Sequence, residues 1–434
     1  MKTRFLLSPL LMLFSLASCR HDVVPLPPGT IKIAVISDIH YMDPSLLKNG
    51  AENGEAFQNY LNADPKLVQY SDGIFKETIK KLKSEQPDIL LVAGDLTKDG
   101  EQVSHQSVVA LLQQLKSAGT KVFVVPGNHD IQNPEARSYD GNTSSPTATI
   151  SANSFSTLYS NFGYGNAIAK DPNSLSYVGQ PYSDLWILAI DACKYYENVG
   201  DIAVVGGVIK PQTMQWIKDQ MALAKAKGVR VLGLMHHNLI EHYSGQSQLD
   251  PGYVVDNFES SANDLMNAGL DVIFTGHYHA NDVSSRESNG NVLYDVETAS
   301  LVDPPLPIRY VTMKNRDLDI TTDYVTKINT ALPEGADLTT YSNIFFSAHL
   351  DGAFSYLLTQ PPFDLSADDA GSVAPLFRNA YMAHFAGDEK ISAEEQSNDD
   401  VIAQLSPTAG MALAALWTDL NPKDNTVHIN LRAK

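Results

Sequence analysis

The chain has 434 residues with ordinary shares of apolar (43%) and charged (19%) residues, so it can bury a large core and favours one large domain plus a smaller one. Its formal net charge of -19 excludes a general nucleic-acid-binding surface, because phosphate backbones are bound by an excess of Lys and Arg. After the first twenty residues no segment is long and apolar enough to cross a bilayer, which predicts a protein that is soluble or tethered.

The N-terminus has the pattern of an export signal. Lys2 and Arg4 precede an apolar stretch over residues 5–16, which ends in Leu16-Ala17-Ser18-Cys19. This ending resembles a bacterial lipobox, in which the cysteine becomes the first mature residue and is acylated. We therefore expect a lipoprotein signal peptide over 1–19, a lipid anchor on Cys19, a Pro-rich linker over 20–30 and a place in the cell envelope, periplasmic or on the outer surface. An ordinary signal peptide that contains a cysteine is the alternative.

From residue 31 onwards, short apolar runs alternate with amphipathic helical stretches. The runs predict buried strands at Ile31–Ile36, Ile89–Val92, Val122–Val125, Trp186–Ile190, Val231–Met235 and Val272–Phe274. Apolar faces at helical spacing predict helices over Asp72–Ser84 and Ser104–Lys116. This alternation predicts an α/β fold with a largely parallel sheet and helices outside it. Later strands, predicted to complete a second sheet, are Tyr294, Ile308–Met313 and Leu318–Tyr324.

After about residue 326 the pattern becomes helical. Amphipathic or apolar segments lie at Tyr341–Leu358, Ser372–Phe385 and Met411–Trp417, and Val427–Leu431 alternates like a last strand. We expect a small helical C-terminal domain over 326–434. The aromatic residues of its first helix, Phe346 among them, are interpreted as helix core rather than as a ligand site. The domain either covers a functional cleft or only stabilises the core, and the sequence leaves both open.

Side chains that can hold metals follow five of the predicted strands. In chain order they are Asp38 and His40, then Asp95, then Asn128 with His129 and Asp130, then His236, then His277 and His279. Parallel strands bring their carboxyl ends to one edge of a sheet, so these side chains are expected to form one site. Carboxylate, imidazole and amide oxygen together suit Zn, Fe or Mn, whereas a calcium site would consist of oxygens alone.

The ordered set of these motifs resembles that of the calcineurin-like metallophosphoesterases, over about residues 31–325. In chain order the motifs are Asp-x-His, Gly-Asp, Gly-Asn-His-Asp, His and Gly-His-x-His. The segment 94–100 is most similar to the branch that contains class III cyclic nucleotide phosphodiesterases. It lacks the tyrosine ligand of purple acid phosphatases, which argues against an Fe(III)-tyrosinate site. The resemblance implies a four-layer α/β/β/α sandwich with a small helical C-terminal domain.

The resemblance also implies a centre of two divalent metal ions, which are Mn, Fe or Zn. The first ion is held by Asp38, His40 and His279, and the second by Asn128, His236 and His277, while Asp95 bridges them. His129 lies near the leaving oxygen as a general acid or charge stabiliser, and Asp130 orients it. A hydroxide held between the metals attacks the phosphorus of a small phosphoester.

The first functional hypothesis is hydrolysis of a small phosphodiester such as a cyclic nucleotide. One alternative is a phosphomonoesterase that acts on nucleotides or sugar phosphates, and another is an inactive, surface-anchored binding protein. The complete ligand set argues against the inactive protein. His237 is either a substrate contact or a neighbour of the ligands, and His242 either approaches a substrate phosphate or is solvated.

Overall fold

The computed structural model describes residues 24–27, 29–387 and 389–432. The predicted signal peptide with Cys19 lies outside the described residues, as do 20–23 and 28 of the predicted linker. Near the start of the described part, the backbone N–H of Leu26 donates to Oδ1 of Asp184 at 2.8 Å, so this segment is attached to the core. Within the described ranges, no helix combines the length and the apolarity that a membrane span requires.

Six strands form the first sheet, in the order β16-β15-β14-β1-β3-β4. Their bounds are β1 (Thr30–Ile36), β3 (Ile89–Val92), β4 (Lys121–Val124), β14 (Pro307–Lys314), β15 (Asp317–Tyr324) and β16 (Thr426–Asn430). β1, β3 and β4 are parallel, whereas β14 to β16 extend the sheet with antiparallel pairing. The prediction that β14 and β15 complete a second sheet is therefore wrong. An apolar run predicts a buried strand, but it does not determine which strand will be its neighbour.

Seven strands form the second sheet, in the order β12-β13-β11-β10-β9-β8-β7. Their bounds are β7 (Ala169–Lys170), β8 (Tyr177–Tyr182), β9 (Leu185–Ile190), β10 (Arg230–Met235), β11 (Val272–Thr275), β12 (Val283–Ser288) and β13 (Asn291–Glu297). β9, β10, β11 and β13 are parallel, and the edge strands pair antiparallel. The six buried strands predicted first are all present, with ends that differ by at most one residue.

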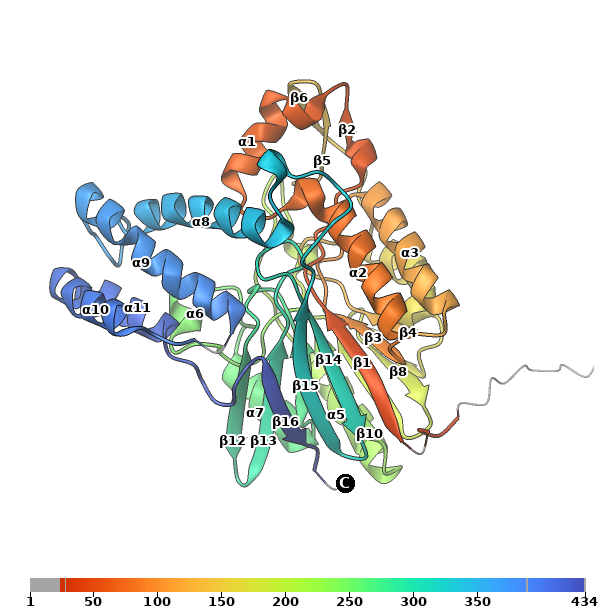
Figure 1. The fold of residues 1–434 in the computed structure, drawn as a ribbon. Helices are drawn as coiled ribbons and strands as arrows, with labels where there is room; N and C mark the ends of the chain where they lie inside the picture. Colours follow the sequence, from red (N-terminus) through yellow and green to blue (C-terminus); the bar gives the residue numbers. More distant parts are fainter. Residues whose placement is uncertain (1–23, 28, 388, 433–434) are drawn as a thin grey trace, which may run out of the picture.

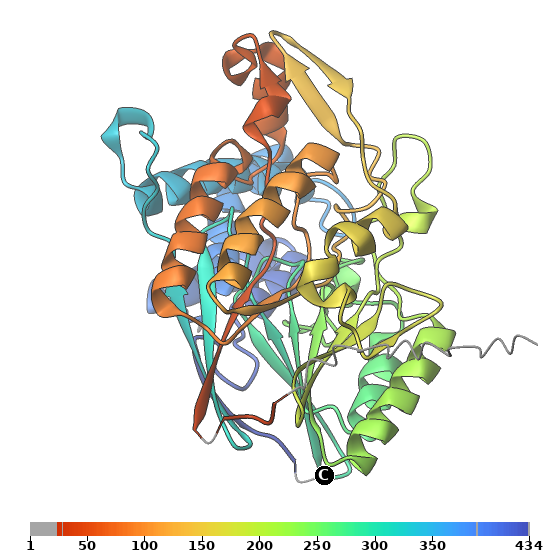
Figure 2. The same ribbon diagram turned by 90° about the vertical axis from the view of Figure 1, so that its right-hand side faces the viewer.

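Helices cover the outer faces of the two sheets, as Figure 2 shows in orange for α2 (Ser71–Glu85) and α3 (Gln102–Ser117) and in green for α5 (Pro211–Ala226). One buried cluster joins apolar side chains of α2 and α3, such as Ile79 and Leu112, to residues of both sheets. A second cluster joins the other face of the second sheet to α5 and to α7 (Phe258–Ala268). The α/β class is confirmed.

Smaller elements surround the edge of the sheets from which the site is built (Figure 1). They include α1 (Glu55–Ala63), α4 (Ala152–Leu158), α6 (Gln246–Leu249) and a small sheet of β2 (Leu47–Lys48), β5 (Arg137–Asp140) and β6 (Thr143–Pro146). The long polar segment after residue 131 therefore contains short strands and helices as well as loops.

Four helices form a lobe beside the sheets (Figure 1, blue). They are α8 (Leu338–Leu357), α9 (Ala367–Ala386), α10 (Ala393–Leu405) and α11 (Pro407–Leu416). The three helices predicted here are confirmed, but α10 was missed because its sequence has no apolar stripe. A buried cluster packs α8, α9 and α11 against Tyr243, Tyr278 and Ala280, which lie in loops near the sheet edge. β16 then returns to the first sheet, and a domain boundary at residue 325 stays a prediction.

Candidate active site

The residues that follow β1, β3 and β11 have an unusual backbone conformation. Positive φ values of 49°, 40°, 45°, 80° and 69° occur at Asp38, His40, Asp95, His277 and His279. Residues other than glycine rarely adopt this left-handed region, and those that do gather at functional sites. Glycine allows a close approach here, because a Cβ added to Gly276 would lie 1.8 Å from Oγ of Ser37. The strand ends are thus drawn together at one edge.

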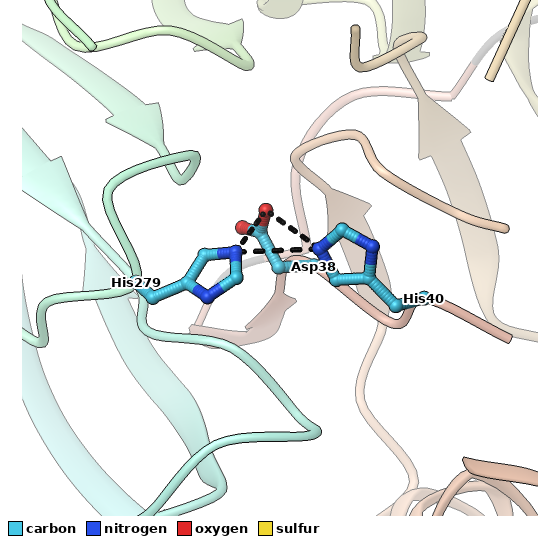
Figure 3. Close-up of side chains that lie close together, drawn as sticks. All are labelled: Asp38, His40 and His279. Carbon is cyan, nitrogen blue, oxygen red and sulfur yellow. Dashed lines mark hydrogen bonds and ion pairs between the residues drawn. The ribbon is translucent and has the colours of Figure 1, made fainter. Parts of the chain in front are cut away.

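Asp38, His40 and His279 point toward one another from two of these turns (Figure 3). Nε2 of His279 lies 3.2 Å from Oδ1 of Asp38 and 3.3 Å from Nε2 of His40. Oδ1 of Asp38 is buried without a hydrogen-bond partner. Nδ1 of His279 donates to Oδ2 of Asp303 at 2.6 Å, which leaves the lone pair on Nε2. Acceptor atoms that face one another without a donor fit a bound cation.

A second group gathers Asp95, Asn128, His236 and His277. Nε2 of His236 lies 3.0 Å from Oδ1 of Asn128 and 3.3 Å from Oδ2 of Asp95. Nδ1 of His236 donates to the carbonyl oxygen of Ala93 at 2.7 Å, so Nε2 keeps its lone pair. The ligand atoms of Asp95, His236 and His277 all lie within 4.8 Å of one another. This group also presents acceptors to a common point, and it fits a second cation.

Asp95 connects the two groups. Its Oδ2 lies 3.3 Å from Nε2 of His236 and 3.6 Å from Nε2 of His40, which belong to different groups. Its Oδ1 accepts the backbone N–H of His129 at 2.9 Å, which fixes the carboxylate. A carboxylate between two dications reduces their mutual repulsion. Asp95 therefore lies between the two groups, at a position that suits a shared ligand.

The carboxylates give this site a strong preference for positive charge. Burial lowers the pKa of the two rings, yet Asp38 and Asp303 raise the pKa of His279 to about 10, and Asp95 raises that of His236 to about 9. Metal ions and protons compete for such nitrogens, since the same carboxylates attract both. The electrostatics of the site thus agree with its donor set.

His129 is held by a different carboxylate from the one predicted. Its Nδ1 lies 2.9 Å from Oδ1 of Asp99, and its Nε2 lies 4.0 Å from Oδ2 of Asp95. Asp130 instead accepts the backbone N–H groups of Leu96, Thr97 and Gly127. Asp130 therefore stabilises the turns beneath the site through these hydrogen bonds. Its predicted role in orienting His129 is wrong. The reason is that its side chain turns back under the loop, away from the ring.

The carboxylate of Asp99 also forms an ion pair with a buried lysine, on the oxygen that does not face His129. Nζ of Lys98 contacts Oδ2 of Asp99 and lies 3.6 Å from Oε1 of Glu101. All three residues are almost fully buried, and the charges of Lys98 and His129 keep the pKa of Asp99 below its ordinary value although burial would raise it. Asp99 is thus an ionised partner that favours a positively charged His129 ring.

The model of the calcineurin-like phosphoesterase family matches residues 31–281, which is more than half of the chain. The chain belongs to the calcineurin-like phosphoesterase family. Members of this family use a dinuclear divalent metal centre, and the two groups of acceptor side chains around Asp95 fit such a centre.

Two curated relatives of the phosphoesterase have the same description. The chain is 31% identical over 137 residues to a protein of Coxiella burnetii that is named probable cyclic nucleotide phosphodiesterase. The chain is also 33% identical over 79 residues to a protein of Vesicomyosocius okutanii with that name. The matches cover 30% and 17% of this chain and 45% and 33% of the relatives. The phosphoesterase thus spans less than half the length of either relative.

Similar solved structures are more distant. A dimetal phosphatase from Danio rerio aligns with a TM-score of 0.47 and 14% identity, over 68% of this chain and 96% of that chain. The NAD nucleotidase of Haemophilus influenzae aligns with a TM-score of 0.34 and 11% identity, over 82% of this chain and 61% of that chain. Likenesses at this level do not indicate a substrate.

A cavity of about 230 Å³ opens at the two metal-ligand groups of the phosphoesterase. Its lining includes His40, Asp95, Asn128, His129, His277 and His279. It also includes five aromatic residues, of which Tyr278 follows His277 in the chain. The other four we call the aromatic wall: Tyr253, Phe346, Tyr381 and Phe385. Phe346 belongs to α8, and Tyr381 and Phe385 belong to α9. The helical lobe therefore forms part of the cavity, and Phe346 serves both the helix core and the cavity lining.

Lys66 is the one lysine or arginine among the described residues that line this cavity. Its Nζ lies 2.9 Å from Oδ2 of Asp64. Burial lowers the pKa of Lys66, but Asp64 outweighs that effect and the pKa is raised, so the side chain is positively charged at neutral pH. The cavity thus presents one lysine charge to a substrate, in addition to the His129 ring.

Two further histidines, His237 and His242, are held by hydrogen bonds within the protein. Nε2 of His237 donates to the carbonyl oxygen of Val205 at 2.9 Å, and its ring centroid lies 4.2 Å from that of His277. His237 is thus a neighbour of a ligand. Nδ1 of His242 lies 2.5 Å from Oδ1 of Asp282, and the residue is fully buried. Both expectations for His242, a phosphate contact and a solvated ring, are therefore wrong.

Sequence reasoning missed Asp99, Lys66 and Asp303. Asp99 lies in the segment 94–100, four residues after Asp95, and that spacing was the available signal. Lys66 and Asp303 lie in irregular segments without periodicity, where nothing in the sequence distinguishes them from surface residues.

Proposed function

We propose that this phosphoesterase hydrolyses a small phosphodiester that carries an aromatic group, such as a cyclic nucleotide. The observation that carries the proposal is one cavity lined both by the metal-ligand groups and by the aromatic wall. The phosphate of the substrate binds at the ligand groups, while its aromatic group packs on the rings. The description of the two relatives supports the same substrate class.

The chain offers three ligands for each cation and one shared ligand. We assign the first ion to Asp38, His40 and His279, the second to Asn128, His236 and His277, and the shared position to Asp95. When bound, two divalent cations supply positive charge to the phosphoryl oxygens and lower the pKa of a water molecule. Asp303 and the carbonyl oxygen of Ala93 fix the tautomers of His279 and His236, so both rings present Nε2.

His129 acts on the leaving oxygen in this proposal. Asp99 occupies its Nδ1, so Nε2 is the nitrogen that remains for the substrate. The side chain is 21% exposed and lines the cavity. A charged ring stabilises the negative charge that develops on the leaving oxygen, and it passes a proton from Nε2 to that oxygen. Asp99 stabilises the charged form of the ring.

The charge of the cavity favours a diester over a monoester. A phosphodiester has one negative charge near neutral pH, whereas a phosphomonoester has about 1.5 to 2. Lys66 is the single cationic lysine or arginine side chain of the described lining, and Asp64 already pairs with it. The additional charge of a monoester would therefore lack a second lysine or arginine as its partner.

The experiment compares two synthetic substrates after reconstitution of the purified protein with Mn²⁺, Zn²⁺ or Fe²⁺. We expect higher kcat/KM for bis(p-nitrophenyl) phosphate than for p-nitrophenyl phosphate. The Asp95→Asn variant should be inactive on both substrates. The control Asp201→Asn removes a charge from an exposed residue that does not line the cavity, and it should match the wild type. A preference for the monoester would reject the proposal in favour of a phosphomonoesterase. If the folded protein has no activity with any of the metals, the hypothesis of an inactive binding protein would be favoured.

We also propose that the protein is exported and held at the cell envelope by acyl chains on Cys19. The support is the sequence Leu16-Ala17-Ser18-Cys19 after a short basic region and an apolar stretch. A substrate reached from this location would be a small phosphodiester outside the cytoplasm.

A further inference from the structure

A second cluster of metal-ligand side chains lies where the helical lobe meets the sheets. Asp282 precedes β12, His384 is in the last turn of α9 and Glu389 follows that helix. Ligand atoms of these three residues all lie within 4.8 Å of one another. Glu389 forms a further such group with Asp419 and Asp424, from the segment between α11 and β16. None of these residues belongs to the groups around Asp95, so this cluster is separate from the catalytic one.

Two carboxylate oxygens of the cluster are buried without a hydrogen-bond donor. They are Oδ2 of Asp282 and Oε2 of Glu389, in residues that are 1% and 8% exposed. The other oxygen of Asp282 is engaged by Nδ1 of His242 at 2.5 Å. Nδ1 of His384 contacts Oε1 of Glu389 and lies 3.8 Å from the unpaired Oδ2 of Asp282. Buried oxygens of this kind are rare in proteins because their desolvation is costly, and each requires a partner.

The surroundings hold more negative than positive charge. Buried carboxylates here belong to Asp282, Asp295, Glu297, Glu389 and Asp424, whereas the buried cationic candidates are Arg309, His242 and His384. Arg309 donates to the backbone carbonyl oxygens of Glu297, Asp424 and Asp282 rather than to their carboxylates. Burial raises the pKa of Glu297, which favours its neutral form. Among the described residues, the other four buried carboxylates still outnumber the three buried cationic side chains.

We propose that this cluster binds a third divalent cation, which fastens the helical lobe to the sheets. Asp282, His384 and Glu389 are its ligands, and Asp419 and Asp424 lie beside Glu389 to complete the coordination. Several carboxylates with one imidazole suit Mn²⁺ or Zn²⁺, whereas Ca²⁺ and Mg²⁺ prefer oxygen ligands alone. The cation offsets the excess carboxylate charge and gives the unpaired oxygens of Asp282 and Glu389 a partner.

The position of the cluster connects it to the aromatic wall. Asp282 lies three residues after His279, and Glu389 lies four residues after Phe385 of the wall. At Gly387, where φ is 77°, an added Cβ would lie 2.5 Å from the carbonyl oxygen of Asn281 and 2.9 Å from Cβ of Asp424. Three segments that are far apart in the sequence therefore touch at this point. A cation here holds the end of α9, and with it the aromatic wall, in place relative to the cavity.

The test is the number of metal ions per chain. The purified protein is loaded with Zn²⁺ and separated from excess metal by gel filtration. Inductively coupled plasma mass spectrometry then gives the number of zinc ions per chain. We expect three ions in the wild type and two in Glu389→Gln. The control is Glu259→Gln, which removes the same charge from an exposed position on α7 and should keep three ions. His384→Gln is a second variant that leaves every carboxylate in place, and it should also hold two ions.

Thermal unfolding provides a second readout. Removal of metal by a chelator should lower the Tm of the wild type more than that of Glu389→Gln, by about 3 °C. Two ions in the wild type, or three in both variants, would overturn the proposal, as would equal decreases in Tm. If neither variant folds, the wild-type number decides alone: three ions support the third site and two exclude it.

Discussion

Nδ1 of His129 lies 2.9 Å from Oδ1 of Asp99, while the neighbouring Asp130 is turned toward backbone N–H groups. Lys98 contacts the far oxygen of Asp99 and is itself buried, so the carboxylate has little freedom to move. This relationship leaves Nε2 of His129 for the cavity. Asp99 is therefore a positioning residue that acts through His129 rather than on the substrate.

Replacement of Asp99 by Asn should lower kcat on bis(p-nitrophenyl) phosphate by about 10- to 100-fold, because the ring loses the charge that orients and stabilises it. The metal content should remain that of the wild type, since Asp99 is not among the proposed ligands. Kinetics and metal analysis of the same sample check both statements. Asp201→Asn serves as the control, and an Asp99→Asn enzyme with unchanged kcat would contradict the role of Asp99.

Replacement of Asp95 by Asn should reduce kcat/KM by about 1,000-fold or more. The shared ligand contacts both groups, and loss of several kcal/mol of transition-state stabilisation corresponds to this factor. The circular dichroism spectrum should stay that of the folded wild type. A folded Asp95→Asn protein with full activity would exclude a bridging role for Asp95.

Replacement of Tyr381 by Leu should raise KM for cyclic AMP about five- to tenfold with a smaller effect on kcat, because ring packing is worth about 1 kcal/mol. The matched control is Tyr356→Leu on α8, where the ring is 69% exposed and does not line the cavity. Steady-state kinetics of both variants provide the comparison. Equal KM values for the two variants would show that the aromatic wall does not contact the substrate.

Asp171 should contribute stability that depends on pH. Burial alone would raise its pKa, but hydrogen bonds from Ser174 and Thr213 outweigh burial and the pKa is lowered. Its contribution is present above the ordinary pKa of about 3.9 and is lost as the pH falls through the lower value of the folded state. Asp171→Asn should lower the free energy of unfolding by about 2 kcal/mol at pH 7 and by less at pH 3. Urea unfolding at both pH values measures this, and a difference that grows toward pH 3 would contradict it.

Replacement of Cys19 by Ser should release the protein from membranes, since acylation at this cysteine is the proposed anchor. Fractionation of cells that produce each form gives the answer. Membrane association that is unchanged in the variant would reject the lipid anchor and leave an ordinary signal peptide or another attachment.

The strands and the metal ligands could be predicted because their signals are local. The apolar run before Asp38 predicts a buried strand, and the polar turn after it contains ligand types at a fixed spacing. The same holds for Asp95 and for His277 with His279. Parallel strands then bring these separate turns to one edge of the sheet. Local sequence patterns were therefore sufficient to predict that ligands far apart in the chain lie close together.

Other features depend on the path of the chain in space. Asp130 follows His129 directly in the chain, whereas Asp99 lies 30 residues before it, and only the direction of each turn determines which carboxylate reaches the ring. β14 pairs with β1 across some 280 residues, which no apolar pattern encodes. The role of Phe346 in the cavity and the meeting of Asp282 with Glu389 arise from the docking of the helical lobe, which is likewise absent from local sequence.

We propose that two cations lie at the sheet edge and share Asp95. Anomalous diffraction at the metal absorption edge, from crystals of active protein, is the decisive measurement. We predict two peaks in the cavity, one among Asp38, His40 and His279 and one among Asn128, His236 and His277, with a carboxylate oxygen of Asp95 at about 2.0 to 2.5 Å from each. A single peak, no peak, or an Asp95 that contacts only one ion would exclude a metal centre that shares Asp95.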